Sequence, residues 1–373
     1  MLNKRLENVE WGEFKIGDLF EINSYQKRFD ANKVEILESG KYPYVVRMGS
    51  NNGQRGFINE DTSYLNEGNT ISFGQDTATM FYQEIPYFTG DKIKILKAKN
   101  KKFSKKNAQF FISAMTKSFA SFSWGSSSFS VEIIKKQKAI LPVLKNGEID
   151  FEFMESFIAE LEAERIAELE AYLAVTNLKD YTLTTEEKQV LSEYDKCIFK
   201  EYNLIDIFEI KNTGNILSRD IVENSGKIPY LCASAENNAV SSYIAYDNKY
   251  LDKGNCIFIG GKTFTVTYQE HDFFSNDSHN LVLYLKDNTQ QIKLNQLFLA
   301  TCVAKSLSHK YSWGDSVSNK KIQKDTASLP TLNDKPDYAK MGTLISAIQK
   351  LVIKDVVEYA DKKISATKTV ISG

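Results

Sequence analysis

The chain has 373 residues and a mass of 42.4 kDa, enough for about two domains. Its 42% hydrophobic and 25% charged residues are typical of a soluble globular protein, without the run of about 18 apolar residues of a membrane helix or the apolar core of a signal peptide. The four scattered cysteines form no CxxC pair, which disfavours a disulfide framework or zinc finger and indicates a reducing cytoplasm. The net charge is −1, from 47 basic and 48 acidic residues, so only the distribution of charge is informative.

An internal repeat organises the sequence. The segment Lys41–Val45 (KYPYV) returns 186 residues later as Lys227–Leu231 (KIPYL). Further matches keep the same order, including Ser123-Trp124-Gly125 with Ser312-Trp313-Gly314 and Leu141-Pro142 with Leu329-Pro330. We interpret this as a tandem duplication of about 187 residues.

Each copy begins with short strand-like segments, which in the first copy read FKIGDLFEI, YPYVVRM, GFI, GNTISFG and FTGDKIKIL. Their β-branched and aromatic residues, separated by Gly and Asn, predict a mainly β domain. An apolar helix is expected at 107–122 and again at 295–310. The Ser-Trp-Gly segment follows, interpreted as structural, and then a lysine-rich strand and the Leu-Pro pair.

After Leu-Pro the periodicity becomes helical. Apolar residues at near-heptad spacing predict a helix over 152–173 and an equivalent helix 187 residues later. We expect the two helices to pack together as an antiparallel coiled coil, although Arg165 interrupts the first stripe and each helix could instead pack only on its own domain. The expected packing residues are Met154, Ile158, Leu161, Leu169, Tyr172, Met341, Ile345, Ile348, Val352, Val356 and Tyr359.

The fold class predicted from these patterns is α+β, with two strand-rich mixed domains in tandem, each followed by a long helix. The expected divisions are a first strand-rich domain at 1–150, a first long helix at 151–180, a linker with the second strand-rich domain at 181–337, and a second long helix at 338–373. The polar stretch Thr176–Lys196 is the expected linker between the copies.

Charge is distributed unevenly along this neutral chain. Eight lysines lie between Lys92 and Lys106 with no acidic residue among them, whereas acidic residues concentrate in the helix at 152–173. Basic β domains beside an acidic helix are the distribution expected where one face meets phosphate, although a lysine run alone is more often a solvated surface.

The chain resembles the DNA-specificity (S) subunit of a type I, or related type IIB, restriction-modification system. The resemblance rests on Trp11–Phe14 with Asp18–Phe20, on a weaker second copy at Phe199–Phe208, and on the two Leu-Pro junctions ILPVLKNGEIDFEFMESFI and SLPTLNDKPDYAKMGTLI. It implies a subunit without catalytic activity or cofactor. Such a subunit reads one half of a split double-stranded DNA sequence with each recognition domain, and it recruits methyltransferase and restriction (nuclease or translocase) subunits through its conserved helices.

Catalytic interpretations fit the sequence poorly. The only histidines, His271, His279 and His309, all lie in the second copy and lack metal-ligand spacing, so no metal site is expected. The segment Gly260–Thr263 imitates the end of a phosphate-binding loop, but the first glycine of that motif would fall at Cys256. Two alternatives stay open from the residues alone: a duplicated β-rich ligand-binding or adhesin-like protein, and the recognition part of a restriction enzyme with its own catalysis.

Base readout in the major groove needs side chains with donors and acceptors, such as Arg or Lys for guanine, Asn or Gln for adenine and carboxylate for cytosine. Loop positions that differ between the copies are the best candidates, because two domains on one scaffold would read different sequences. The candidates are Gln26, Arg28, Gln54, Arg55, Gln75 and Asp76 in the first copy and Arg219, Glu236, Lys262, Thr263 and Asn319 in the second. The paired asparagines Asn51/Asn52 and Asn237/Asn238 recur in both copies, which favours turn chemistry for them.

Phosphate contacts need positive charge or hydroxyl groups without base specificity. The candidates are Lys101, Lys102, Lys105, Lys106, Ser126, Ser127, Lys135 and Lys136 in the first copy and Ser316, Ser318, Lys320 and Lys321 in the second.

Overall fold

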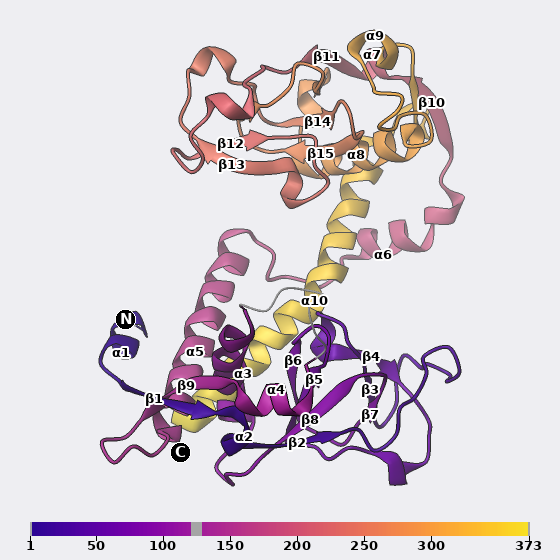
Figure 1. The fold of residues 1–373 in the computed structure, drawn as a ribbon. Helices are drawn as coiled ribbons and strands as arrows, with labels where there is room; N and C mark the ends of the chain where they lie inside the picture. The colour runs from indigo at the N-terminus through magenta and orange to yellow at the C-terminus, as the bar shows by residue number, and fades with distance from the viewer. Residues whose placement is uncertain (1, 121–128, 372–373) are drawn as a thin grey trace. The chain divides into compact units, whose positions relative to one another are not determined.

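The computed structural model describes residues 2–120 and 129–371, which fall into two units divided between Leu169 and Glu170 (Figure 1). Both units combine helices and strands, as the predicted α+β class requires. Among the described residues, no helix is both long and apolar enough to span a membrane.

The first unit contains three small sheets, with strand orders β2-β8-β5-β6, β4-β3-β7 and β1-β9. All neighbouring strands are antiparallel except the parallel pair β3 and β7. The strands are β1 (Glu10–Lys15), β2 (Phe20–Ser24), β3 (Pro43–Val45), β4 (Gln54–Phe57), β5 (Thr70–Gly74), β6 (Met80–Gln83), β7 (Phe88–Thr89), β8 (Ile93–Ala98) and β9 (Lys138–Val143). The α-helices are α1 (Leu2–Glu7), α2 (Ile16–Leu19), α3 (Lys105–Phe119), α4 (Val131–Lys136) and α5 (Phe151–Val175), the last of which ends in the second unit.

The core of the first unit forms where α3 packs on β6 and β9. Ser104 and Asn107 form a capping box at the start of α3, and Phe111 and Met115 on one face of the helix are buried. Strand β5 is buried along its whole length because it lies between β6 and β8 in its sheet.

The second unit repeats this topology with strand orders β11-β17-β14-β15, β13-β12-β16 and β10-β18-β19. The strands are β10 (Phe199–Asn203), β11 (Phe208–Asn212), β12 (Ile228–Leu231), β13 (Val240–Ile244), β14 (Cys256–Gly260), β15 (Thr265–Gln269), β16 (Phe274–Ser275), β17 (Leu281–Leu285), β18 (Thr326–Leu332) and β19 (Lys335–Pro336). The α-helices are α6 (Thr185–Ser192), α7 (Leu204–Ile207), α8 (Lys293–Leu307), α9 (Asn319–Ile322) and α10 (Tyr338–Ile371).

Two of the expected strands differ in the structure. The segment FKIGDLFEI is interrupted by α2, because Ile16 is buried where the chain turns from β1 into β2. The expected lysine-rich strand is a short helix, α4, followed by β9. Ser130 caps α4 by accepting a hydrogen bond from the Ile133 amide, so Lys135 and Lys136 lie in a helical turn.

The long helices begin with equivalent caps. The Asp150 carboxylate accepts a hydrogen bond from the Phe153 amide at 2.9 Å, and Asp337 accepts one from the Lys340 amide at 3.0 Å. The expected helix at 152–173 therefore lies inside α5. Of the predicted packing residues, Met154 and Met341 are buried in the cores of their own units.

The segment between the copies is not a simple linker, contrary to the expectation for Thr176–Lys196. It contains α6, which packs on α10 within the second unit. Glu187 of α6 is buried and its carboxylate accepts hydrogen bonds from Ser346 (2.6 Å) and Lys350 (2.9 Å). The sequence signal was weak because α6 has few apolar residues and its anchor is a charged side chain.

Candidate nucleic-acid interface

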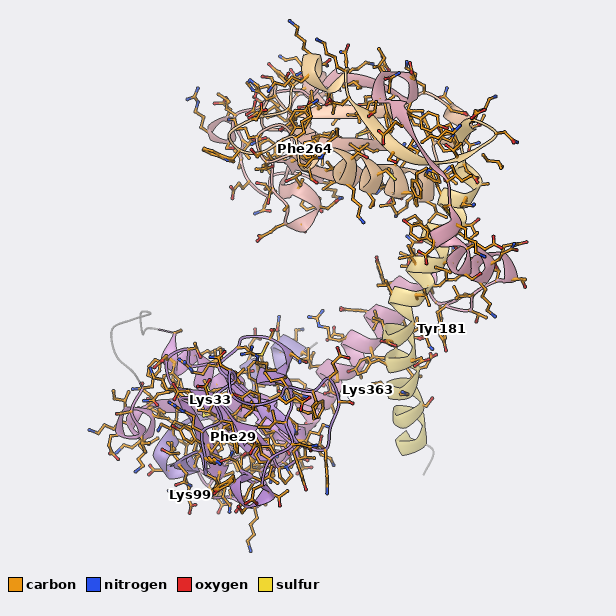
Figure 2. The ribbon with its side chains drawn as sticks, turned by 90° about the vertical axis from the view of Figure 1, so that its right-hand side faces the viewer. Phe29, Lys33, Lys99, Tyr181, Phe264 and Lys363 are labelled. Atoms are coloured by element: carbon orange, nitrogen blue, oxygen red, sulfur yellow. The ribbon has the colours of Figure 1, made fainter. Side chains whose placement is uncertain are left out.

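Three of the chain's six arginines, Arg28, Arg47 and Arg55, line one hollow of about 350 Å³ in the first unit. Phe29, which also lines it, is buried among the strands of this unit (Figure 2). Beside it, the buried Tyr44 hydroxyl donates a hydrogen bond to the Phe29 carbonyl at 2.8 Å. Burial raises the pKa of Tyr44, although the nearby Arg55 charge acts in the opposite direction. The hollow therefore combines a few apolar side chains with the three arginines and the two carboxylates Asp30 and Asp91.

Acidic side chains restrain two of these arginines. Arg47 Nη1 donates to Asp76 Oδ2 at 2.5 Å, and Lys92 Nζ reaches the same oxygen at 2.9 Å. Arg28 Nη1 lies 3.5 Å from Asp91 Oδ1. Guanidinium groups held in this way keep a defined orientation while still offering other N–H donors.

The structure thus brings together three of the sequence candidates, Arg28, Arg55 and Asp76. It adds Arg47, which sequence reasoning missed. The available signal was that Arg47 directly follows the repeated YPYVV strand, where the second copy has Ala233.

The other first-copy candidates lie elsewhere or have internal roles. Gln54 precedes Arg55 on β4 and lines a different hollow, together with Tyr82 and Leu161, because neighbouring strand residues point to opposite faces. The backbone N–H of Gln26 donates to Asn66, and the backbone of Gln75 bonds to Lys92 and Phe129.

The turn interpretation of the paired asparagines is confirmed. Asn52 and Asn238 both have positive φ. Their side-chain amides donate to the carbonyls of Tyr82 (3.1 Å) and Tyr268 (3.0 Å), so each ties its turn to a neighbouring strand.

In the second unit, Lys262 lies on the turn between β14 and β15, with its Nζ 3.1 Å from Asp277 Oδ2. Nδ1 of His279 lies 2.7 Å from the other carboxylate oxygen of Asp277. Thr263 beside it is held inside the turn, because its hydroxyl donates to the Ala233 carbonyl and contacts the Thr265 hydroxyl.

The remaining second-copy candidates are separate. Arg219 is strongly exposed in a 3₁₀ turn (Ser218–Asp220), and the backbone N–H of Glu236 donates to Ser234. The Asn319 amide donates to the Ile210 carbonyl and the Asn212 side chain, so it joins α9 to β11.

The candidate phosphate lysines of the first unit do not form one continuous run in space. Lys92 directly precedes the six-residue strand β8 and lies near Asp76, whereas Lys101, Lys102, Lys105 and Lys106 follow the other end of β8, about 20 Å away at ~3.3 Å per residue. Lys105 is paired with Glu84 at 2.7 Å. Lys135 of α4 packs beside Gly17 of α2, whose carbonyl also accepts a hydrogen bond from Lys99 (labelled in Figure 2), so these two lysines gather at α2.

In the second unit Ser318 caps α9 by accepting a hydrogen bond from the Lys321 amide, and Lys320 follows Asn319 in the same helix. Lys321 Nζ is bound to Asp315 at 2.5 Å and to the Ser316 carbonyl at 2.9 Å. Ser126 and Ser127 lie outside the described residues.

The Ser-Trp-Gly segment of the second copy forms a closed loop whose tryptophan is exposed. Trp313 is 80% exposed at the tip of the loop closed by the Ser312–Asp315 bridge, so its ring contributes little to the core. The first copy's Ser123-Trp124-Gly125 lies outside the described residues.

Apolar side chains remain exposed on the long helices. Tyr172 of α5 is 59% exposed, and Val352 and Tyr359 of α10 are 73% and 53% exposed. Ile348 and Val356 are also exposed, whereas Ile158, Leu161, Leu169 and Ile345 are partly buried.

The second unit also has a hollow of about 1170 Å³ between α6, α8, β18 and α10.

Comparison with known proteins identifies the family. The model of the type I restriction modification DNA specificity domain matches residues 8–171 and again 198–360. The chain belongs to this family. It is therefore a restriction-modification specificity subunit with two tandem target-recognition domains.

Two relatives agree with this assignment. The specificity subunit S.BcgI of a type II restriction enzyme from Heyndrickxia coagulans is 24% identical over 351 residues, covering 92% of this chain and 96% of that protein. The S subunit of a type I system from M. genitalium has the same fold, with a TM-score of 0.59 and 15% identity over 97% of this chain and 94% of that one.

Specificity subunits are the non-catalytic components of restriction-modification complexes, and the adhesin-like and catalytic alternatives are set aside. Within residues 2–120 and 129–371, no three His, Cys, Asp or Glu side chains gather in a way that could hold a metal ion.

Proposed function

We propose that each unit reads one half of a bipartite double-stranded DNA target with the loops around its β5–β6 or β14–β15 turn. The observation that supports this proposal most strongly is that Arg28, Arg47 and Arg55 line one hollow beside Asp76. Arginine is the side chain best suited to guanine, because its fork matches the N7 and O6 acceptors. In the second unit Lys262 and His279 occupy the corresponding surface with a different donor set.

A selection experiment tests this reading. The full chain would select duplexes from a randomised pool at fixed salt, and the bound sequences would be determined. We expect Arg55→Ala to relax one position of one half-site, with a loss of discrimination of about 1–3 kcal/mol, and to leave the other half unchanged. Arg165→Ala is the matched control, because Arg165 is an exposed arginine of α5 paired with Glu168. Equal losses on specific and scrambled DNA would make Arg55 a phosphate contact.

We assign the lysines after β8 to phosphate. Replacing Lys101, Lys102, Lys105 and Lys106 with Ala should weaken binding to all duplexes and flatten the dependence of affinity on salt, by about one unit of slope for each phosphate that is no longer neutralised. Titrations at several salt concentrations measure this slope. Lys188→Ala with Lys196→Ala, in the segment between the copies, provides the control; an unchanged slope in the β8 variant contradicts the assignment.

We also propose that methyltransferase and restriction subunits bind the long helices, and that the complex works in the cytoplasm. The exposed apolar side chains Val352 and Tyr359 support a protein contact there, because charged or polar residues are expected on a permanently solvated helix face. Packing of α5 against α10 as an antiparallel coiled coil is part of the same proposal and rests on their matching apolar stripes.

A further inference from the structure

The β5–β6 turn of the first unit and the β14–β15 turn of the second share one backbone design. Each follows a glycine, Gly74 or Gly260, whose carbonyl accepts a hydrogen bond from the residue four positions later. That residue, Ala78 or Phe264, has positive φ in both units. A pair of threonine hydroxyls closes both turns, at 2.8 Å in the first and 2.9 Å in the second.

The surroundings clamp both turns in the same way. The backbone carbonyl of Gln75 accepts a hydrogen bond from the Phe129 amide, and that of Gly261 accepts one from Val317. On the other side, the amide of Gln75 donates to the Lys92 carbonyl, whereas that of Gly261 donates to the Asn280 side chain. Lys92 and Asn280 lie in the equivalent connections, β7–β8 and β16–β17. Both turns are therefore rigid platforms for the side chain that follows.

The two turns carry side chains of opposite charge, and so do the connections that face them. The first turn carries the acid, Asp76, and its partner from the β7–β8 connection is the cation Lys92. The second turn carries the cation, Lys262, and its partner from the β16–β17 connection is the acid Asp277. Burial alone would raise the pKa of Asp277, but hydrogen bonds from His279 and Lys262 hold it below its usual value. Asp76 also binds Arg47, whose equivalent in the second unit is Ala233.

Building on the proposed DNA-reading function, we propose that Asp76 and Asp277 are positioning residues that aim Arg47 and Lys262 at bases, one in each half-site. In this proposal, Arg47 determines base specificity in the first unit and Lys262 determines it in the second. The ligand feature that each recognises is a major-groove acceptor edge, such as N7 and O6 of guanine.

The reason is geometric. A long cationic side chain without restraint samples many rotamers and binds whichever phosphate is near, which gives affinity without specificity. An ion pair between the rigid turn and the facing connection, with the carboxylate on either side, removes that freedom and fixes the direction of the remaining N–H donors. The exchange of charge between the units retains the ion pair and changes the presented donor from a planar fork to an ammonium group.

The test uses the full chain and randomised duplexes, with base preference at each position of both half-sites as the readout. We expect Asp76→Asn to lower the preference at one position of one half-site about ten-fold and Asp277→Asn to do so only in the other half. Asp76→Glu should restore part of the lost preference. The control is Glu13→Gln, which removes the carboxylate of a more exposed ion pair, the one with Lys138 between β1 and β9.

A variant that carries the second unit's charges on the first turn separates an effect on base preference from an effect on folding. Asp76→Lys with Lys92→Asp and Arg47→Ala copies the second unit's charges onto the first turn and retains an ion pair. We expect this variant to unfold at the wild-type temperature, within a few degrees, and to change the base preferred at that one position. Unchanged preferences in all variants, or equal weakening on every sequence, would overturn the assignment. If the wild-type chain itself selected no sequence, the proposed DNA-reading function would fail instead.

Discussion

Asn66 and Asp252 occupy equivalent positions in the two units, but the first is an amide that can donate a hydrogen bond and the second is a carboxyl group that titrates. The buried Asn66 amide donates to the Tyr87 carbonyl at 3.1 Å while its oxygen accepts from Gln26. Asp252 accepts from the Gly214 amide at 2.9 Å, but an ionised carboxylate cannot donate as Asn66 does. Burial raises the pKa of Asp252 to about 6, so in the folded second unit the carboxyl is mainly protonated below pH 6 and mainly ionised above it.

This difference predicts a pH-dependent stability of the second unit. Because the folded-state pKa of Asp252 lies above its unfolded value near 3.9, the folded state binds the extra proton. Its stabilising contribution is complete below about pH 4, is lost as the pH rises through 6, and is absent at neutral pH. Allowing for solvent screening, we expect Asp252→Asn to stabilise the second unit by about 1–2 kcal/mol at pH 7.5 and by almost nothing at pH 4.

Thermal unfolding at the two pH values measures this effect. The converse variant, Asn66→Asp, serves as the control and should destabilise the first unit at pH 7.5. An equal gain from Asp252→Asn at both pH values would show that the proton on Asp252 is not responsible.

Sequence comparison of the two copies found some site residues and missed others for a physical reason. Arg55 and Asp76 were selected because two domains on one scaffold are expected to differ at the positions that read different sequences, and the fold places both near the arginine hollow. Arg47 was missed because its role depends on contact with Asp76, 29 residues away in the sequence, and such a contact becomes visible only in the fold. Ser312-Trp313-Gly314 was interpreted as structural because the segment recurs in both copies, and the fold shows the Trp313 ring exposed on a loop.

At the scale of elements, α6 shows how a short polar helix can belong to a domain core. Glu187 and Lys350 are both largely buried, and the Thr184 amide and Ser346 hydroxyl complete the hydrogen bonding of the carboxylate. Burial tends to raise the pKa of Glu187, but these partners lower it below its usual value, so its contribution is present at neutral pH and is lost on acidification.

We therefore expect Glu187→Ala to destabilise the second unit by about 2–3 kcal/mol at pH 7, because it leaves the Lys350 charge without its partner. Chemical denaturation of the full chain would measure the loss. The neighbouring exposed Glu186 provides the matched variant, and Glu186→Ala should change stability by less than about 0.5 kcal/mol. Similar losses in the two variants would indicate an effect of helix propensity rather than of the buried contact.

Long elements were predictable and short ones were not. The helical stripe over 152–173 and its repeat gave α5 and the first part of α10, since several turns of consistent periodicity outweigh local noise. The helices α2, α4 and α6 have only 4, 6 and 8 residues, too few to establish a period, and their packing against neighbours defines them.

For the whole molecule, the repeat of domain and long helix predicts that helix length sets the distance between the two DNA half-sites. α5 has 25 residues, a length of about 37 Å at ~1.5 Å per residue, close to the 34–36 Å of one turn of B-DNA. We expect half-sites about one turn apart, separated by several unread base pairs. Inserting four residues in each long helix, after Glu164 and after Lys354, adds about 6 Å and should lengthen the spacer by one or two base pairs.

The second insertion lies beyond Ser346 and Lys350, so the α6 contact is kept. Mapping the methylated sites of the assembled complex would give the spacer length directly. An unchanged spacer in an active lengthened variant, or a continuous target in the wild type, would show that helix length does not set the spacing.

The position of α6 also determines where a protease can divide this chain usefully. Residues 176–184, between the end of α5 and the start of α6, contain neither helix nor strand, and Lys179 in this segment is half-exposed. Trypsin cleavage after Lys179 would leave α6 on the carboxyl-terminal fragment, with its buried glutamate still bound to α10. Each fragment would then keep its own three sheets, its own apolar core and one long helix, so limited digestion followed by separation in denaturant would give two half-size fragments as candidates for independent refolding.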